Sequence, residues 1–462
     1  MSKIKLKKEM KREKLQELKA WKANPRRKPL LLMGARQVGK TWLMQEFGRL
    51  YYERTAYIRF DKDEEIKQVF ATSGYHIPTL IMAIEAKVGF QLQAGKHLVI
   101  LDEIQECPHA LTSLKYFCEE VREHHIIAAG SLLGVHQHVG TGFPVGKVNM
   151  QTLYPLSFTE FLQATGKEIL CEQLKKGNFE LLDSFAHTLA SMLRLYYYVG
   201  GMPEAVCAYI ETQDFNEVRQ VQDEILASYA ADFSKHIPAN LASKVSMLWD
   251  SVPVQLAKEN KRFIYKDVHK NMRAKDLEDA LDWLLRAGLI YRVNRVSKPA
   301  LPINPYADGA FKIYFLDVGL LGAKTGIEAN VVINGNTIFQ EFKGALTEQY
   351  VQQQLRAECN VAPHYWLSES QRAEVDFLME CHASVVPIEV KAAQNLQAKS
   401  LKSYCNKYTP PVAVRCSMAP YYKQELQATT LINLPLYAVC HITQQCRDAI
   451  NEQRSLNTER EC

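Results

Sequence analysis

Short, mainly apolar segments recur through the first 150 positions of the chain. Four of them predict strands, at 29–33, 55–60, 97–101 and 125–129. The segment at 97–101 is continuously apolar, which is typical of parallel sheets buried on both faces. Helical spacing of apolar residues at 77–94 and 109–122 separates the strands. The alternation predicts a three-layer α/β domain with a parallel sheet.

The pattern changes after about residue 150. Positions 155 to 235 are mostly of helical type, interrupted by Gly200-Gly201-Met202-Pro203. Between 240 and 300 the order is helix, strand, helix, strand, with the strands at 263–265 and 289–293, which predicts a winged helix. From 311 onward strands and helices alternate again, and no internal repeat is evident.

Composition places the chain among ordinary globular proteins. It has 462 residues, of which 47% are hydrophobic and 23% charged, which excludes general disorder and suggests two to four domains. The eleven cysteines form no C-x-x-C pair, as expected of reduced thiols in a cytosolic protein. No apolar run reaches the roughly eighteen residues of a membrane span, and no secretory signal is recognisable. We expect a cytoplasmic protein without a membrane partner.

The net charge of +5 is concentrated at the N-terminus. Residues 1–28 contain twelve Lys or Arg and three Glu, a charge of +9, so the remaining chain carries −4. A protein that coats nucleic acid is therefore excluded. We expect residues 1–28 to form an amphipathic helix that packs on the core and exposes its basic face. The alternative is that this segment contacts the phosphate backbone of DNA in a salt-sensitive manner.

A glycine-rich loop follows the first predicted strand. Residues 34–41 fit the pattern G-x-x-x-x-G-K-[ST], in which two glycines let backbone N–H groups turn toward phosphate oxygens. Lys40 is expected to neutralise the β- and γ-phosphates of ATP, and the Thr41 hydroxyl to bind Mg²⁺. The expected nucleotide-binding residues are Gly34, Ala35, Arg36, Gln37, Val38, Gly39, Lys40 and Thr41.

Polar residues end the strands at 97–101 and 125–129. Asp102 is expected to hold Mg²⁺ through water, and Glu103 to polarise the water that attacks ATP. Ser131 is a candidate for contacting that water or the γ-phosphate. Taken alone, each observation also has a structural explanation. Asp102 and Glu103 could simply be solvated residues at a strand end, and Ser131 could cap a turn.

Five segments together resemble a prokaryotic family of AAA-type ATPases within the AAA+ superfamily. They are Leu32–Thr41, Leu101–Gln105, Ala129–Ser131, Leu153–Phe158 and Gly200–Glu204. The resemblance implies that Asp102 and Glu103 are the Walker B pair and that Ser131 is the sensor-1 residue. It also suggests a homo-oligomer. Arg36, Arg122 and Arg194 are the candidates for an arginine finger, and the sequence selects none of them.

The predicted helix at 275–284 is acidic, which argues against its insertion into a DNA major groove. A structural or inter-domain role is favoured for the predicted winged helix. Basic residues nearby keep DNA contact open as an alternative, namely Lys261, Arg262, Lys266, Lys270 and Arg273.

A second group of polar residues occurs near the C-terminus. Asp376 and the Glu389-Val390-Lys391 segment lie on two predicted strands, and Glu348 lies on a predicted helix. Carboxylates and a lysine at one point suit a divalent metal and an activated water. The order resembles the PD-(D/E)xK core of restriction endonucleases, which implies that Glu348 is the helix carboxylate, that Asp376 and Glu389 bind Mg²⁺ or Mn²⁺, and that Lys391 is catalytic. An alternating, half-exposed strand explains E-x-K equally well.

The predicted organisation combines these observations in an α/β protein with a P-loop NTPase core of ASCE/AAA type. The predicted parts are a basic N-terminal helix (1–28), an ATPase core (29–165), a helical lid-like region (166–239), a winged-helix-like unit (240–300), a PD-(D/E)xK-like domain (301–445) and a tail (446–462). The predicted function is Mg²⁺-dependent ATP hydrolysis coupled to a nuclease-like, DNA-directed domain. The alternative is a nucleotide-switched regulatory module whose C-terminal domain binds a protein partner without catalysis.

Overall fold

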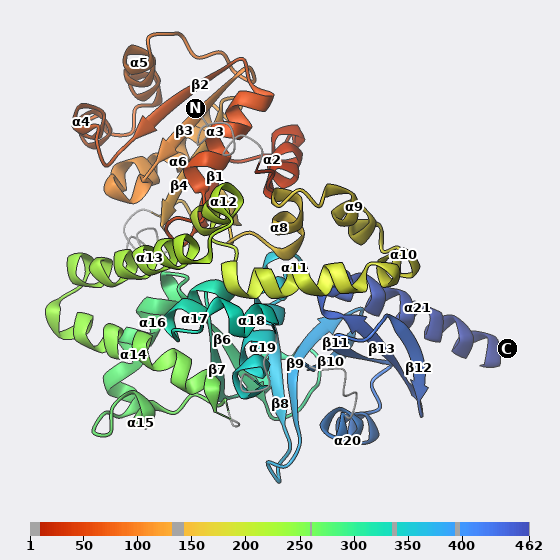
Figure 1. Ribbon diagram of the computed structural model, residues 1–462. Coiled ribbons are helices and arrows are strands. Elements are labelled where there is room, and N and C mark those ends of the chain that lie inside the picture. Colours follow the sequence, from red (N-terminus) through yellow and green to blue (C-terminus); the bar gives the residue numbers. More distant parts are fainter. Residues whose placement is uncertain (1–9, 132–142, 259–260, 335–339, 393–397, 462) are drawn as a thin grey trace. The chain divides into compact units, whose positions relative to one another are not determined.

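The computed structural model describes residues 10–131, 143–258, 261–334, 340–392 and 398–461 (Figure 1). The chain divides into two compact units. Of the described residues, the first unit contains those of Lys11–Pro155 together with Asp282–Leu289, and the second contains those of Leu156–Leu281 and those from Ile290 onward. Each unit is described below by itself.

The first unit is built on a five-stranded sheet in which every neighbouring pair is parallel. Its strands are β1 (Leu30–Gly34), β2 (Arg54–Arg59), β3 (His97–Asp102), β4 (His125–Ser131) and β5 (Asn149–Thr152). Their order is β2-β3-β4-β1-β5, so β4 lies between β1 and β3. The parallel sheet predicted from the apolar segments is confirmed.

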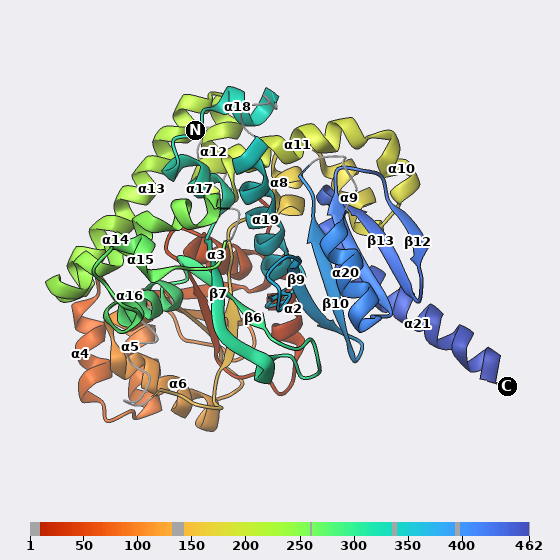
Figure 2. The same ribbon diagram turned by 90° about the horizontal axis from the view of Figure 1, so that it is seen from below.

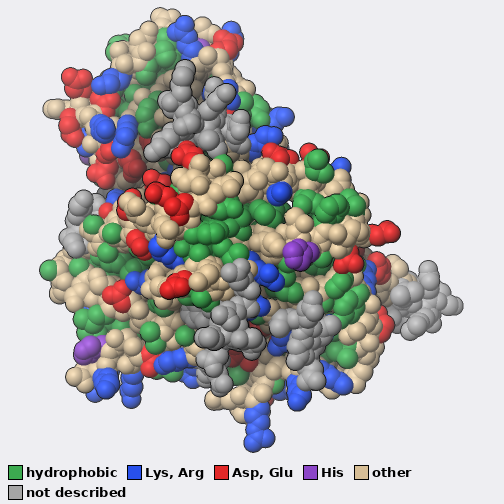
Figure 3. Space-filling view, viewed as in Figure 1, with side chains coloured by type: hydrophobic (Ala, Val, Ile, Leu, Met, Phe, Trp, Pro, Cys, Tyr) green, Lys and Arg blue, Asp and Glu red, His purple; other side chains and the backbone are tan. Residues whose placement is uncertain are grey.

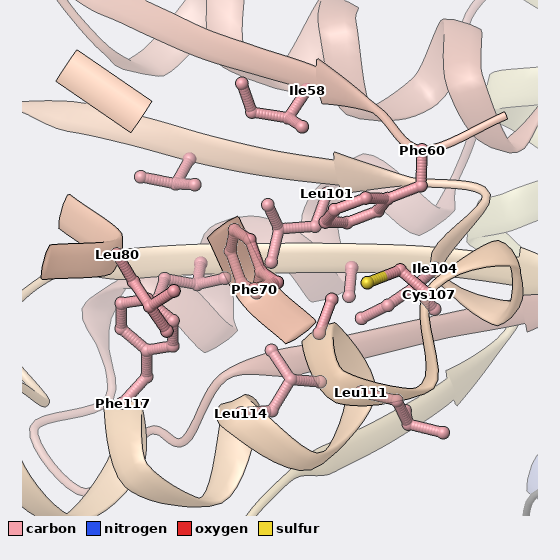
Figure 4. Packing of buried hydrophobic residues seen from close by; sticks show 14 of the residues in the cluster. Ile58, Phe60, Phe70, Leu80, Leu101, Ile104, Cys107, Leu111, Leu114 and Phe117 are labelled. Atoms are coloured by element: carbon pink, nitrogen blue, oxygen red, sulfur yellow. The ribbon is translucent and has the colours of Figure 1, made fainter. Parts of the chain in front are cut away.

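Helices cover this sheet and bury its apolar side chains. The helices are α2 (Lys14–Ala23), α3 (Lys40–Tyr51), α4 (Glu64–Thr72), α5 (Ile77–Val88) and α6 (Pro108–Glu120), with the 3-10 turn η1 (Ile104–Glu106) after β3. Figure 4 shows the core beneath α4 to α6, where Phe70 lies beside Leu101 of β3, and Leu80 and Phe117 lie next to each other farther along the same core. Because strand side chains alternate between faces, the remaining apolar strand residues lie on the opposite face.

The N-terminal basic segment includes a helix that packs on this unit. The structure describes α2 from Lys14, and positions 1–9 of the predicted helix lie outside the described residues. The apolar side chains of Leu15, Leu18 and Trp21 are buried, and the Trp21 ring lies 6.4 Å from the Phe47 ring of α3. The expected packing of an apolar face on the core is therefore present.

The second unit contains an eight-stranded mixed sheet (Figure 2). Its strands are β6 (Ile290–Val296), β7 (Ala307–Phe315), β8 (His364–Leu367), β9 (Glu374–Cys381), β10 (Ser384–Val390), β11 (Val412–Ser417), β12 (Tyr422–Leu426) and β13 (Thr429–Pro435). The order is β12-β13-β11-β10-β9-β8-β6-β7. Strands β10, β11 and β13 are parallel to one another, whereas β8, β9 and β10 form an antiparallel meander. Helix α19 (Gln340–Ala357) precedes the meander, and α20 (Lys399–Tyr408) separates β10 from β11.

Other helices of this unit occupy the region that the sequence predicts to be helical. They are α8 (Phe158–Ala164), α9 (Glu168–Lys176), α10 (Phe179–Ser184), α11 (Ala186–Val199), α12 (Pro203–Thr212) and α13 (Phe215–His236). Later helical elements are α17 (Val318–Lys324), α18 (Ala329–Asn334), α21 (Ile442–Glu461) and the 3-10 segments η2 (Asn304–Tyr306) and η4 (Leu436–His441). Among the described residues, no helix is both long and apolar enough to cross a membrane.

The region predicted to be a winged helix differs in its strands. Helices α14 (Ala239–Ala257), α15 (Tyr265–Val268) and α16 (Ala274–Arg286) are present, but the strand expected at 263–265 is not formed. Phe263 makes one backbone bond to Phe311 of β7 and stacks on its ring, with 5.1 Å between the centroids, so its apolar side chain is buried without a strand ladder. The second expected wing strand, β6, pairs with β7 and β8 inside the large sheet.

The Gly200-Gly201 pair lies where two backbone segments approach closely. A Cβ atom on Gly201 would lie 2.1 Å from the Leu156 carbonyl oxygen, and one on Gly200 would lie 2.1 Å from the Asp317 carboxylate. Asp317 is fully buried and accepts hydrogen bonds from the backbone N–H groups of Gly201, at 2.7 Å, and Gly319, at 3.0 Å. The motif is thus explained by close packing around one buried carboxylate.

Candidate functional site

The glycine loop connects β1 to α3 in the conformation that a phosphate-binding loop requires. A Cβ atom on Gly34 would lie 2.4 Å from the Leu153 carbonyl oxygen, so only glycine fits there. Gly39 has a φ of 92°, in the left-handed region, immediately before the first residue of α3. The backbone geometry therefore explains why glycine is required at both positions of the motif. The first N–H groups of α3, which have no partner within the helix, point toward the loop.

Lys40 points into the loop. Its ammonium donates to the carbonyl oxygens of Gly34, at 3.0 Å, and Ala35, at 2.8 Å. Burial lowers the Lys40 pKa to about 8, although the negative charges of Glu103 and Asp102 partly oppose this shift. A partly buried ammonium whose hydrogen bonds, among the described residues, go to neutral carbonyls is a strong partner for an incoming anion.

Thr41 and Asp102 meet at the carboxyl edge of the sheet. The Thr41 hydroxyl donates to Oδ2 of Asp102 at 2.8 Å, and the Tyr57 hydroxyl donates to the same oxygen at 2.9 Å. Asp102 is 2% exposed. A hydroxyl and a carboxylate in contact, beside the loop, are oxygen donors of the type that Mg²⁺ prefers, so these residues fit the metal expected with ATP. The sequence analysis did not identify Tyr57, which occupies a strand position with no distinguishing motif.

Glu103 adopts a left-handed backbone conformation, with φ of 51° and ψ of 45°. Such values are uncommon for a residue other than glycine and cost on the order of 1–2 kcal/mol. The side-chain amide of Gln105 donates to Oε2 of Glu103 at 2.5 Å. Strain of this kind is found where a functional side chain must be aimed.

Ser131 is the last residue of β4 and lies opposite Gly34 in the β1–β4 register. Because β3 and β4 are also neighbours, the ends of three parallel strands bring Gly34, Asp102 and Ser131 to one edge of the sheet. This is the edge at which ligands of open parallel sheets bind. The structure thus brings together the nucleotide-site residues that the sequence predicts.

Arg12 is a site residue that the sequence analysis did not identify. Its guanidinium is 5% exposed and donates to the Val38 carbonyl of the loop at 3.0 Å. It also donates to the Tyr154 carbonyl at 2.6 Å. In the sequence Arg12 is one of twelve basic residues near the N-terminus, so nothing in the pattern distinguishes it.

The arginine-finger candidates have separate environments. Arg36 lies in the glycine loop itself. Arg122, after α6, donates from Nε to the Cys118 carbonyl at 3.3 Å. Arg194 lies on α11 of the second unit and lines a cavity there.

The C-terminal candidates also converge within the second unit. Lys391 forms an ion pair with Glu389 at 2.6 Å, and Oδ2 of Asp376 accepts the Val390 N–H at 2.8 Å. Burial and the charges of Glu348 and Glu389 raise the Asp376 pKa well above its usual value. Among the described residues, Oε2 of Glu389 is buried without a hydrogen-bond partner.

Two lysines that the sequence analysis did not place in this site neutralise it. Lys261 forms an ion pair with Glu348, and the fully buried Lys312 of β7 lies 2.5 Å from Glu374 and 3.9 Å from Glu348. Burial raises the Glu348 pKa, but Lys261 and Lys312 outweigh it, so that the pKa is lowered. Within the described ranges, no group of three or more His, Cys, Asp or Glu side chains is arranged to hold a metal ion. The expected second metal site is therefore not seen.

Comparison with family models assigns parts of the chain. Residues 26–162 match the AAA domain family. The likeness to AAA-type ATPases is thereby confirmed for this segment. Residues 190–331 and 343–437 match two domains of unknown function, DUF8612 and DUF4143 respectively. No curated protein sequence matches the chain.

Solved structures resemble the chain only distantly. The Walker-type ATPase PABY2304 of Pyrococcus abyssi has 14% identity and a TM-score of 0.44, over 68% of this chain and 96% of that one. Cdc6p from Pyrobaculum aerophilum has 12% identity and a TM-score of 0.25, over 70% and 93%. The STAND protein PH0952 from Pyrococcus horikoshii has 13% identity and a TM-score of 0.26, over 74% and 45%.

Proposed function

We propose that the chain binds ATP on residues 34–41 and hydrolyses it with Mg²⁺. The observation that carries the proposal is the 2.8 Å contact between the Thr41 hydroxyl and the Asp102 carboxylate at the mouth of the loop. These two side chains would hold the metal, which supplies charge neutralisation for the phosphates when bound. Lys40 would bind the β- and γ-phosphates, and Glu103 would orient and polarise the attacking water.

Turnover of ATP by the purified full-length chain tests this proposal. Replacing Glu103 by Gln should lower the hydrolysis rate by about 100-fold or more while leaving nucleotide binding intact. Glu106→Gln is the matched control, because Glu106 is an exposed acid three residues away. Equal rates for the wild type and Glu103→Gln would contradict the assignment. Lys40→Ala should abolish binding itself.

A second candidate function is metal-dependent cleavage of DNA by the C-terminal part of the chain. Two observations favour it: the order α19, β8–β10, α20, β11, and the convergence of Asp376, Glu389 and Lys391. A divalent cation, Mg²⁺ or Mn²⁺, would have to compete with Lys261 and Lys312 for the carboxylates. The test is incubation of plasmid and single-stranded DNA with Mn²⁺, comparing the wild type with Asp376→Asn and the exposed control Glu369→Gln.

Loss of cleavage in Asp376→Asn alone would support the nuclease. Equal digestion, or none, would support the alternative that this domain is a non-catalytic module for binding a partner. In that alternative the ATPase acts as a nucleotide-operated switch, and residues 240–300 transmit its state rather than contact DNA. The resemblance to AAA-type ATPases suggests a homo-oligomer. Measuring the molar mass in solution by light scattering, with and without nucleotide, tests this suggestion.

A further inference from the structure

A small, partly open cavity in the second unit has two cations among its mostly apolar lining residues. Its volume is about 40 Å³, and it is lined by side chains from α11, α18 and α19 and by residues that follow β10 and β11. Arg194 of α11 and Lys343 of α19 both line it. Space of this size accommodates about three water molecules, which is comparable to one tetrahedral oxyanion.

The two cations lack a negative partner within the described part of the chain. No ion pair or side-chain hydrogen bond of Arg194 or Lys343 is formed there, although both are partly buried. Burial and the positive charge of Arg194 lower the Lys343 pKa. Lys343 also lies in the first turn of the 18-residue helix α19, where a positive charge is unfavourable because of the helix dipole. A bound anion would relieve each of these costs.

Tyr197 supplies an independent indication of a ligand. Its side chain is 6% exposed and lines the same cavity, and its hydroxyl has no hydrogen-bond partner among the described residues. Burial raises its pKa, so the group remains a hydroxyl and a donor. The Thr347 hydroxyl, which donates to the Lys343 carbonyl at 2.7 Å, is the neutral side-chain oxygen that acts on Tyr197 there and slightly opposes the rise of its pKa. An oxyanion in the cavity would give the Tyr197 hydroxyl a charged and therefore stronger acceptor.

The location of the cavity also suits a ligand. Ala392 and Met418, which line it, follow the carboxyl ends of the parallel strands β10 and β11. Ligands of sheets with parallel strands bind outside these ends. Helix α11 contributes Arg194 and Tyr197 from more than 140 residues earlier in the chain, so the site is assembled by the fold rather than by one loop.

We propose that this cavity is a binding site for a free tetrahedral oxyanion, of which inorganic phosphate is the natural example. Arg194 and Lys343 neutralise its charge, and the Tyr197 hydroxyl donates a hydrogen bond to one of its oxygens. Its lining residues Thr347 and Ala392 directly adjoin Glu348 and Lys391 of the carboxylate cluster along the chain, but none of the described residues that line the cavity carries a carboxylate. The proposal does not depend on the ATPase function proposed above.

Calorimetric titration with inorganic phosphate, at ionic strength matched with chloride, tests the site. The full-length Lys40→Ala protein is the parent, because it removes phosphate binding at the nucleotide loop. We expect one phosphate per chain. Arg194→Gln and Lys343→Gln should each weaken binding by about tenfold or more, and Tyr197→Phe by a smaller factor. The exposed Lys402 of α20 gives the charge-matched control Lys402→Gln, which should bind as the parent does.

Thermal unfolding separates binding from a structural role. Without phosphate, Lys343→Gln should be as stable as its parent or more stable, because one of two like charges is removed. With phosphate, the parent should gain more in unfolding temperature than the variant does. The proposal is overturned by the absence of saturable binding, or by an equal loss in Lys402→Gln. Phenyl phosphate binding as tightly as phosphate would overturn the assignment to a free oxyanion and indicate a phosphomonoester.

Discussion

Arg12 should determine both the stability of the first unit and its affinity for nucleotide. Arg12→Gln removes two charge-assisted hydrogen bonds, a buried one to the Val38 carbonyl and a partly buried one to the Tyr154 carbonyl. At about 1.5 kcal/mol or more for each bond, the free energy of unfolding should fall by about 3 kcal/mol. If about half of that energy orders the loop, nucleotide binding must supply it instead, and the Kd should rise about tenfold.

Urea unfolding and calorimetric titration with Mg²⁺-ADP measure the two effects on the same protein. Lys14→Gln is the control, since Lys14 is on the adjacent turn and forms only an i,i+3 ion pair with the exposed Glu17. That pair contributes about 0.5 kcal/mol or less. A change below about 1 kcal/mol in Arg12→Gln, with an unaltered Kd, would refute the view that the guanidinium holds the loop.

Three further expectations follow from the geometry. The Lys40 pKa is about 8, and bound phosphates favour the charged ammonium. The affinity for a non-hydrolysable ATP analogue should therefore be highest below pH 8 and fall as the pH rises through that value. Lys40→Arg should flatten this pH profile, because the arginine stays charged. Gly201→Ala should destabilise by about 3 kcal/mol or more, whereas Gly322→Ala, whose added Cβ would meet its nearest atom at 3.9 Å, should be neutral or stabilising in urea titrations. Lys312→Met should cost about 3–5 kcal/mol, because it removes a fully buried cation from the half-buried Glu374 and the buried Glu348. A melting temperature equal to that of the wild type would contradict this.

The geometry of the proposed nucleotide site was largely predictable because its residues are local in sequence. Gly34 is required by a close approach to another backbone segment, and Gly39 by its positive φ. Both requirements are visible in the sequence as the two glycines of the motif. The unbroken apolar strand before Asp102 predicts a buried parallel strand, which fixes the edge where that carboxylate lies. Tyr57 and Arg12 were missed, since a tyrosine in a strand and an arginine in a basic segment have no distinctive spacing.

The C-terminal cluster shows where sequence spacing stops being informative. The order of Glu348, Asp376, Glu389 and Lys391 correctly predicts that they converge. The charge that neutralises them comes from Lys312 on β7, which reaches the site only because the strand predicted as part of a winged helix extends the large sheet toward it. An E-x-K pattern specifies alternation along a strand, and it carries no information about cations that tertiary packing brings to the same point.

The number of basic residues near the N-terminus does not by itself show which of them are available to contact DNA. The face shown in Figure 3 mixes acidic and basic side chains without a broad basic area. Within residues 1–28, Arg12 is buried, the Lys22 ammonium lies 4.0 Å from the Tyr52 ring, and Lys28 donates to the Gly146 carbonyl at 2.6 Å.

Several of the charges that suggest a DNA contact therefore have partners inside the first unit. Deleting residues 1–22 would also remove the buried Leu18 and Trp21, so loss of DNA binding in such a variant would report unfolding as readily as a lost phosphate contact. Neutralising the exposed Lys11 and Lys19 leaves those apolar contacts in place. A reduced salt dependence of DNA binding in that variant, with unchanged stability, is the result that distinguishes a basic arm from a structural helix.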